Sequence, residues 1–280
     1  MNRIVDTVLF RENIIELWHE CFGDERKYVE FFLDNCPNKV CIGYVEDGRL
    51  ISMLFLLNGN LNGIACKYIY AACTAKKERK KGLMGSLIEY SKIYCIQNAI
   101  DFIFLVPAEE RLYSYYSRFG FLPKMKRCES VIKSKAGEMN LNKIEDVRTV
   151  SKIRLRMLEK IDCFCFDEKT TEYSVAEFIY TGGEIFHLDG ENETLFFAVR
   201  DGNDVIFKEF LTAFYTNITN ILNLFENFGS ENVYIRAPIV YNDVNIGGNC
   251  TKCGMLFPVT DTAKKYIHEQ DAFYAGMYLD

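Results

Sequence analysis

Residues 73–90 have the sequence CTAKKERKKGLMGSLIEY, and this stretch decides the fold. It joins the end of a β-rich run to a segment in which Leu83, Leu87 and Ile88 recur at helical spacing, so a helix is expected to begin near Gly82. The first backbone N–H groups of a helix have no partner within the helix and carry partial positive charge. This helix start is therefore suited to binding an anion.

Glycine and basic residues distinguish this helix start from an ordinary one. A glycine costs a helix about 1 kcal/mol relative to alanine, so Gly82 and Gly85 favour a functional explanation, namely free access of a ligand to the backbone. Positive charge for further phosphates comes from Lys76, Lys77, Arg79, Lys80 and Lys81. A basic run alone is more often a solvated surface. The combination predicts a pyrophosphate-binding loop.

The elements around this loop alternate between helix and strand. Asp47-Gly48 and Asn62-Gly63 have the chemistry of tight hairpin turns, so three consecutive strands are expected to form an antiparallel meander before the loop. In chain order, the pattern predicts two short helices within 10–35, strands in 39–61 and 66–75, a helix from about 82 to 99, a strand at 101–107, a helix at 110–120 and an extended chain from 121.

From about residue 141 the same order of elements begins again. Two helical stretches precede a hairpin centred on Asp201-Gly202, which a helix and two strands follow. The expected ranges are helices at 142–161 and 170–183, the hairpin at 194–211, a helix at 217–229, and strands at 231–238 and 250–259. The end of this half, CGMLFP, is similar to FGFLP at the end of the first. We interpret this as a degenerate internal duplication.

In this context the loop resembles the pyrophosphate loop of the GNAT (GCN5-related N-acetyltransferase) superfamily. That loop has Arg or Gln, two further residues, Gly, one residue, and Gly or Ala. Arg79 and Gly82 match it, while Met84 stands in place of the final small residue and Gly85 follows directly. A second family landmark is a tyrosine four residues before a Gly-Phe pair, which Tyr116 matches. The resemblance covers roughly residues 5–130.

The YSRFGF segment and the tandem arrangement are similar to the enhanced-intracellular-survival acetyltransferases. This resemblance implies an α/β (α+β) tandem GNAT-like fold, in which a mixed, mostly antiparallel central sheet is flanked by helices and the second half is a degenerate repeat. It implies an acetyl-CoA-binding catalytic GNAT domain at 1–135. A degenerate GNAT-like domain at 140–280 would contribute to the acceptor cleft.

The resemblance also implies a function, that of an acetyl-CoA-dependent N-acetyltransferase. A primary amine, on a small molecule or a protein, attacks the thioester directly. Tyr116 would be the general acid, and the chain's terminal carboxylate at Asp280 would reach the active site. Backbone groups of Ala72, Cys73 and Thr74 would hold the pantetheine arm, and the pyrophosphate would be held by Arg79, Lys80, Lys81, Gly82, Leu83, Met84, Gly85 and Ser86.

Two questions stay open at this point. The general base is not identified, and the candidates near the expected site are Glu109, Glu110, Tyr68 and Tyr70, each of which is also compatible with an exposed carboxylate or a core phenol. The alternative function is a non-catalytic CoA- or ligand-binding and sensing module with a GNAT fold. Cys73 is expected to be a small strand residue and no nucleophile, because no histidine lies near it in sequence.

Composition restricts the partners. The net charge of -6 and a pI near 5.3 argue against nucleic acid or an anionic membrane, and an assembly of identical chains is compatible with both values. The sequence shows no leader pattern and no long apolar run, so a cytoplasmic protein with reduced cysteines is expected. The pairs Cys250/Cys253 and Cys163/Cys165 lack a well-spaced second pair, and no metal site is predicted.

Overall fold

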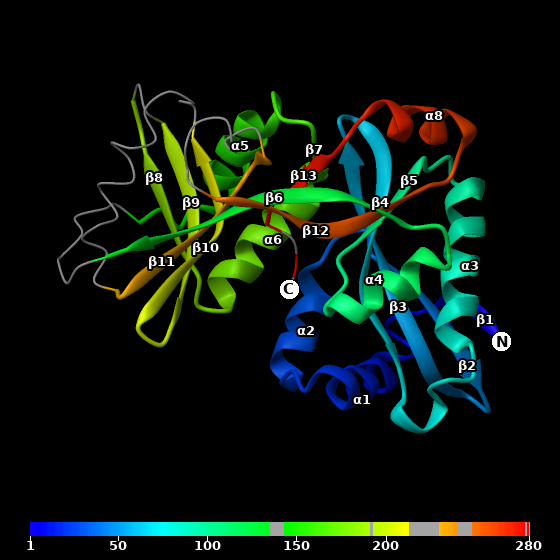
Figure 1. The fold of residues 1–280 in the computed structure, drawn as a ribbon. Helices are drawn as coiled ribbons and strands as arrows, with labels where there is room; N and C mark the ends of the chain where they lie inside the picture. The colour runs from blue at the N-terminus through cyan, green and yellow to red at the C-terminus, as the bar shows by residue number, and fades with distance from the viewer. Residues whose placement is uncertain (135–142, 191–192, 213–229, 240–247, 278, 280) are drawn as a thin grey trace. The chain divides into compact units, whose positions relative to one another are not determined.

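The computed structural model describes residues 1–134, 143–190, 193–212, 230–239, 248–277 and 279. Its backbone contacts divide the chain into two compact units (Figure 1). The first unit contains Met1–Pro123 and Gly254–Asp271, and the second contains Lys124–Cys253 and Ala272–Asp280. Each unit is therefore assembled from two separate stretches of sequence.

The first unit is built on a sheet with the strand order β1-β2-β3-β4-β5-β12. Its elements are β1 (Asn2–Val5), α1 (Arg11–Phe22), α2 (Arg26–Asn35), β2 (Val40–Glu46), β3 (Arg49–Leu61), β4 (Ile64–Thr74), α3 (Leu83–Gln97), β5 (Phe102–Leu105), α4 (Glu110–Ser117), β12 (Asn249–Pro258) and α8 (Asp261–Glu269). Neighbouring strands are antiparallel except β4 and β5, which are parallel. The expected meander is confirmed, and β1 was not predicted.

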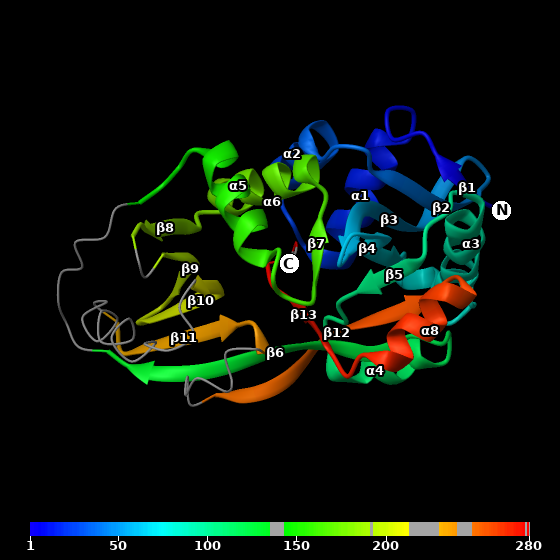
Figure 2. The ribbon, with the colours of Figure 1, turned by 90° about the horizontal axis from the view of Figure 1, so that it is seen from above.

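The period of two along β3 determines which helices cover which face of this sheet. Leu54 and Leu56 contribute to a cluster with Leu87 of α3. Phe55, between them, points the other way, where its ring centroid lies 5.9 Å from that of Trp18 and 4.8 Å from that of Phe32. Helices α1 and α2 therefore cover one face and α3 and α4 the other, as Figure 2 shows.

Tight turns connect the meander as the sequence predicts. Asp47 and Gly48 have φ of 47° and 77°, and Asn62 and Gly63 have φ of 51° and 81°. Two successive residues at positive φ match the right-handed twist of the flanking strands, and Asp, Asn and Gly adopt this conformation at low cost.

The second unit contains a sheet with the strand order β6-β11-β10-β9-β8. Its elements are β6 (Leu122–Lys133), α5 (Val147–Leu158), β7 (Cys163–Phe166), α6 (Glu168–Tyr180), β8 (Glu184–Leu188), β9 (Thr194–Asp201), β10 (Asp204–Thr212), β11 (Asn232–Ala237) and β13 (Phe273–Ala275). β10 and β11 are parallel, and the other neighbours in this order are antiparallel. The predicted hairpin corresponds to β9 and β10. The helix expected at 217–229 lies outside the described residues.

A buried ion pair lies in the core of the second unit. Arg154 of α5 donates from Nε to Oε2 of Glu209 on β10 at 2.5 Å, and the two side chains are 1% and 0% exposed. Glu209 Oε1 also accepts from the Tyr274 hydroxyl at 3.2 Å and from the Met277 amide at 3.1 Å. The pair thereby holds the last described segment of the chain against α5 and β10.

The division into units differs from the expected ranges, 1–135 and 140–280, for a reason found in strand pairing. β6 pairs with β11 over Cys128–Lys133, so it belongs with the second unit although it falls in the first expected range. The end of β12 pairs with β5 from Met255 to Pro258, so it belongs with the first. Most of β6, from the first half of the sequence, therefore lies in the second unit, and the end of β12, from the second half, lies in the first unit.

Candidate active site

The distal part of β4 departs from its neighbour β5. The β4–β5 ladder runs from Cys66↔Phe102 to Ile69↔Leu105, whereas β4 itself continues to Thr74. On its other side β4 stays paired with β3, but with Ala71 and Ala72 opposite the single residue Leu54, which is a β-bulge. Beyond Ile69, β4 therefore continues to Thr74 past the end of its ladder with β5.

The loop after β4 turns the chain into α3 through two residues at positive φ. A short 3₁₀ segment, Lys76–Glu78, is followed by Lys80 at φ 66° and Gly82 at φ 79°, directly before α3 begins at Leu83. The Ser86 amide donates to the Gly82 carbonyl at 3.0 Å and closes the first helical turn. The amides of residues 83–85 precede this bond, so they have the position expected of an anion-binding helix N-terminus.

Glycine is required at Gly82 and at Gly85 for different reasons. A Cβ at Gly82 would meet nothing within 4 Å, so glycine is needed there for its positive φ. A Cβ at Gly85 would lie 3.0 Å and 3.2 Å from the Phe119 ring, so glycine is needed there for packing. Packing against Phe119 therefore explains Gly85 without the expected role of giving a ligand access to the backbone.

Side chains of the loop fall into two groups. Arg79, Lys80 and Lys81 are exposed, and Arg79 Nε donates to the Thr74 carbonyl at 3.1 Å, which ties the loop to the end of β4. Lys81 pairs with Glu78 at 2.7 Å. Met84, in contrast, packs against the core cluster beneath α3. The residue that departs from the family pattern therefore directs its side chain into the core.

Tyr116 is the last residue but one of α4 and is 9% exposed. It belongs to the same hydrophobic cluster against which Ala72 and Met84 pack. Its ring lies 5.2 Å from that of Tyr115 and 5.9 Å from that of Phe121, centroid to centroid. Burial raises the pKa of Tyr116 to about 12, so the phenol is neutral at pH 7.

The remaining predicted residues have diverse surroundings. Cys73 is 6% exposed, and burial raises the pKa of its thiol well above the usual range, which agrees with a strand residue rather than a nucleophile. The Ser86 hydroxyl donates to the Leu83 carbonyl at 2.8 Å inside α3. Asp280 lies outside the described residues. Of the candidate bases, Tyr70 shares a hydroxyl–hydroxyl hydrogen bond of 2.7 Å with Tyr28.

One residue at this site was not predicted from the sequence. Cys21, in the last turn of α1, donates to the Thr74 carbonyl at 3.4 Å, and Arg79 Nη2 lies 3.9 Å from its sulfur. A hydrogen bond from Cys73 and the nearby Arg79 guanidinium lower the pKa of Cys21 to about 7. Nothing in the sequence pattern links Cys21 to β4.

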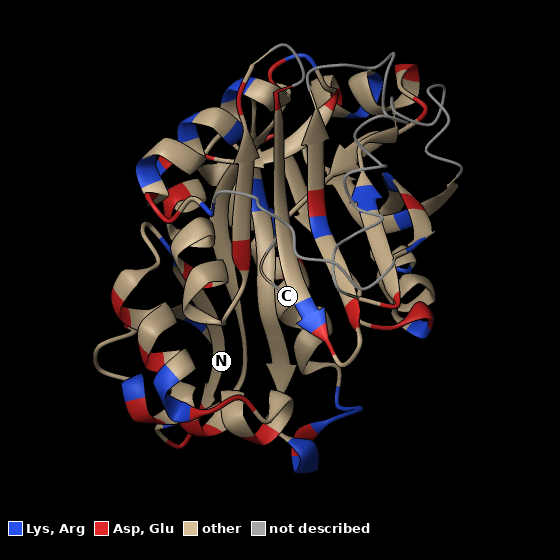
Figure 3. Cartoon of the chain, turned by 90° about the vertical axis from the view of Figure 1, so that its left-hand side faces the viewer, with Lys and Arg blue, Asp and Glu red and all other residues tan. Residues whose placement is uncertain are grey.

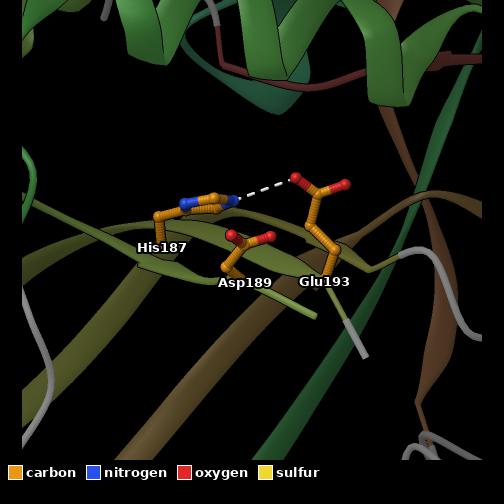
Figure 4. A group of neighbouring side chains, drawn as sticks. All are labelled: His187, Asp189 and Glu193. Atoms are coloured by element: carbon orange, nitrogen blue, oxygen red, sulfur yellow. Dashed lines mark hydrogen bonds and ion pairs between the residues drawn. The ribbon is translucent and has the colours of Figure 1, made fainter. Parts of the chain in front are cut away.

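A separate group in the second unit has ligand atoms close enough for a cation. His187, Asp189 and Glu193 each offer one atom, and these atoms lie within 4.8 Å of one another (Figure 4). His187 Nε2 is 3.0 Å from Glu193 Oε1, and Arg156 pairs with the same oxygen. Glu193 therefore already has the His187 ring and the Arg156 guanidinium as partners in this group.

Two surface properties bear on partners. On the side drawn in Figure 3, acidic and basic residues are intermixed along the described helices. Within the described ranges, no helix combines the length and the apolar composition needed to cross a membrane. Neither observation identifies a partner.

The fold and this loop define a class of protein, the GNAT acetyltransferases. Residues 10–123 match the family described as an acetyltransferase (GNAT) domain, so this part of the chain is a GNAT domain. The match confirms the family predicted from Arg79, Gly82 and Tyr116, and with it an enzyme of the N-acetyltransferase class. It ends at Pro123, where the first stretch of the first unit also ends.

Several solved structures share the fold of nearly the whole chain. A probable N-acyltransferase of unknown function from Enterococcus faecalis has 12% sequence identity and a TM-score of 0.70, over 92% of this chain and 72% of that one. Eis1 from Mycobacterium abscessus has 8% identity and a TM-score of 0.67, over 94% and 74%. A GCN5-related N-acetyltransferase from Anabaena variabilis has 14% identity and a TM-score of 0.69, again over 94% and 74%. No curated protein sequence matches the chain.

Proposed function

We propose that the chain transfers an acetyl group from acetyl-CoA to a primary amine by direct attack of the amine on the thioester. The observation that carries this proposal is the conjunction of three features in one unit: the part of β4 that continues beyond its ladder with β5, the helix start at Gly82, and Tyr116 in the adjoining core cluster. Acetyl-CoA is the acyl donor, and no metal is assigned a role.

The proposed cofactor contacts follow the backbone. The pantetheine arm lies along Ala72, Cys73 and Thr74. Its two amide groups would form hydrogen bonds with the backbone of this segment, as a neighbouring strand would. The pyrophosphate binds at the backbone amides of residues 83–85. Arg79, Lys80 and Lys81 supply positive charge, and the rest of the loop, up to Ser86, lines the pyrophosphate site. Arg79 now donates to the Thr74 carbonyl, so this guanidinium would turn toward phosphate when the ligand binds.

Tyr116 is proposed as the proton donor to the leaving sulfur. When the C–S bond of the tetrahedral adduct breaks, the sulfur keeps the electron pair and accepts the phenolic proton. A phenol with a pKa of about 12 is a poor acid toward a thiolate in water, whose pKa is about 8.5. Burial in this unit, however, raises the pKa of the Cys41 and Cys95 thiols to about 12 as well. Desolvation of the CoA sulfur would likewise raise the pKa of its thiol, which favours protonation of the thiolate by the phenol.

The second candidate is a CoA-sensing module without turnover. Two features favour it, namely Met84 in the loop and a second half that lacks an RxxGxG pattern. The Met84 side chain, however, packs against the core cluster. A binder has no need of a buried neutral proton donor, so Tyr116 favours the enzyme. Three further points stay predictions: that the second unit contributes to amine binding, that Asp280 reaches the active site, and that the protein is cytoplasmic.

The test measures release of free CoA thiol from acetyl-CoA across a panel of primary amines. Tyr116→Phe is expected to lower kcat by roughly 100-fold or more while leaving acetyl-CoA affinity unchanged, because it removes only the donated proton. Tyr115→Phe, one residue away with its ring against that of Tyr116, is the matched control and should keep its turnover. Tight CoA binding without turnover on any amine would favour the sensing module.

A further inference from the structure

The end of β4 contains a residue in a strained conformation. Ala71, one of the two bulge residues opposite Leu54, has φ 48°. An alanine in this left-handed region is destabilised because its Cβ lies too close to the backbone. A residue keeps such a conformation only where the surrounding contacts hold it there. Contacts near Ala71 must therefore favour the bulged strand over a regular one.

A regular strand would have a different register beyond the bulge. Before the bulge Phe55 lies opposite Tyr70, and after it Ser52 lies opposite Thr74. Without the bulge the first register would continue, and Ser52 would lie opposite Cys73 instead. Because side chains alternate between the two faces of a sheet, this shift by one residue would move every side chain after the bulge to the other face. The bulged and the regular strand are therefore two competing arrangements of the same segment.

Ser52 on β3 makes two side-chain hydrogen bonds to the strand beyond the bulge. Its hydroxyl donates to the Cys73 carbonyl at 3.0 Å and shares a hydrogen bond of 2.7 Å with the Thr74 hydroxyl. A serine hydroxyl has one proton and a carbonyl can only accept, so the Thr74 hydroxyl must donate to Ser52 Oγ. Ser52 is 0% exposed, and bulk water would not replace either bond.

The hydroxyl pair exists only in the bulged register. The Ala75 amide donates to the Ile51 carbonyl at 2.9 Å, so these residues form a hydrogen-bonded pair of the antiparallel ladder. The next pair, Ser52 and Thr74, is then of the non-hydrogen-bonded kind, in which the two side chains lie closer together. In the regular register Ser52 would face the Cys73 thiol, a weaker hydrogen-bonding group, and the Thr74 hydroxyl would lie on the other face.

We propose that Ser52 is a positioning residue for acetyl-CoA, because its hydroxyl selects the bulged register of β4. The link to acetyl-CoA rests on the proposed function, in which the pantetheine arm lies along Ala72, Cys73 and Thr74. In the bulged register the backbone groups of Thr74 point away from β3, which is the direction from which an extended ligand pairs with a strand. Ser52 itself lies on β3 and acts through its contacts with β4.

Ser91 provides a matched control. It is also 0% exposed, and its hydroxyl donates to the Leu87 carbonyl at 2.8 Å. Both residues lie in α3, one helical turn apart, so this bond selects no strand register. Replacing either serine by alanine removes a buried hydroxyl and leaves a carbonyl with one hydrogen bond fewer. A purely structural effect should therefore appear in both variants.

The decisive experiment measures the affinity of the full chain for two ligands by calorimetry. Acetyl-CoA contains the pantetheine arm, whereas adenosine 3′-phosphate 5′-diphosphate contains the pyrophosphate and lacks this arm. Ser52→Ala should bind acetyl-CoA about tenfold more weakly and the diphosphate within about twofold of the unsubstituted chain. Ser91→Ala should bind both ligands within about twofold. Equal weakening of both ligands by Ser52→Ala, or an unchanged affinity for acetyl-CoA, would overturn the proposal.

A second pair of variants separates the hydroxyl from the volume of the side chain. Threonine and valine have the same shape and differ in the hydroxyl, so any crowding by the added methyl groups affects both alike. Ser52→Thr should bind acetyl-CoA at least about fivefold more tightly than Ser52→Val, because only threonine can replace the two hydrogen bonds. Equal affinity of these two variants would show that the hydroxyl has no role.

Hydrogen exchange without ligand tests the register independently of the proposed function. The peptide that contains residues 72–75 should exchange at least about fivefold faster in Ser52→Ala than in Ser91→Ala, since the bulged register is less well held. Equal exchange in the two variants would contradict the register role. An unsubstituted chain that binds neither ligand would refute the proposed function instead, and the exchange comparison would still decide whether Ser52 holds the register.

Discussion

Replacing Gly82 by alanine tests how the helix start is built. The residue has φ 79°, and a non-glycine residue in this left-handed region costs about 1–2 kcal/mol. A Cβ there would meet nothing within 4 Å, so no steric term is added. Alanine also lowers the entropy of the unfolded chain, which returns about 0.4–1 kcal/mol. The expected net loss in the free energy of unfolding is therefore about 0–1.6 kcal/mol, with a central value near 1 kcal/mol.

Gly85→Ala is the matched control, because it makes the same chemical change three residues further along. Here the backbone is helical, so alanine contributes up to about 1 kcal/mol of helix propensity. The new methyl group would lie 3.0 Å from the end of the Phe119 ring, which must shift by a few tenths of an ångström. The net effect should be close to zero, and Phe119→Leu in the same chain should convert it into a gain.

Urea unfolding and acetyl-CoA titration of both variants make the comparison. If the Gly82→Ala variant keeps the strained φ, its free energy of unfolding falls. If φ relaxes instead, the amides turn away from the ligand and the free energy of acetyl-CoA binding falls. The sum of these two losses should exceed the same sum for Gly85→Ala by about 1 kcal/mol. Gly82→Asn should recover much of the loss, since asparagine tolerates positive φ. Equal behaviour of the two alanine variants in both assays would refute the distinction between a conformational and a packing glycine.

Three further outcomes are expected. Because burial raises the pKa of Tyr116 to about 12, its proton is present below that pH and is lost above it; kcat/KM should therefore rise with pH as the amine deprotonates and show no descending limb below about pH 11, whereas a limb near pH 9 would exclude Tyr116 as the acid. Arg79→Gln should weaken acetyl-CoA binding by roughly tenfold and reduce its dependence on salt, and an unchanged salt dependence would show that Arg79 does not bind phosphate. Arg154→Met should cost about 3–5 kcal/mol of unfolding free energy, because it leaves the Glu209 charge buried without its partner. Adding Glu209→Leu should recover part of that loss but not all, since the Tyr274 hydroxyl then lacks its acceptor, and full additivity of the two losses would contradict the pairing.

Local chemistry made much of the first unit predictable. The Asp47-Gly48 and Asn62-Gly63 turns require positive φ that few other residues adopt, and the apolar spacing after Gly82 fits only a helix. β1 was missed because its four residues, NRIV, show little alternation and its strand state depends on pairing with β2. Such short edge strands are determined by tertiary contacts rather than by propensity.

The candidate site was predictable to the extent that its residues follow a local pattern. Arg79, Gly82 and Tyr116 follow a family spacing, and the structure brings the strand end, the loop and α4 together in one unit. The packing reason for glycine at Gly85 was not predictable, since Phe119 lies on a different segment of the chain. Cys21 was not predictable either, because its contact with Thr74 joins residues 53 positions apart in sequence.

The pairing of β12 with β5 affects the order in which the protein can mature on the ribosome. The β5 segment FIFL is fully inside the finished first unit, and its partner on one side, Met255–Pro258, is synthesised about 150 residues later. Until then, the nascent GNAT domain presents an apolar strand edge that could pair with another chain. A protein ending after residue 135 would keep that edge permanently. Such a fragment should therefore aggregate even though it contains every residue proposed to bind the cofactor.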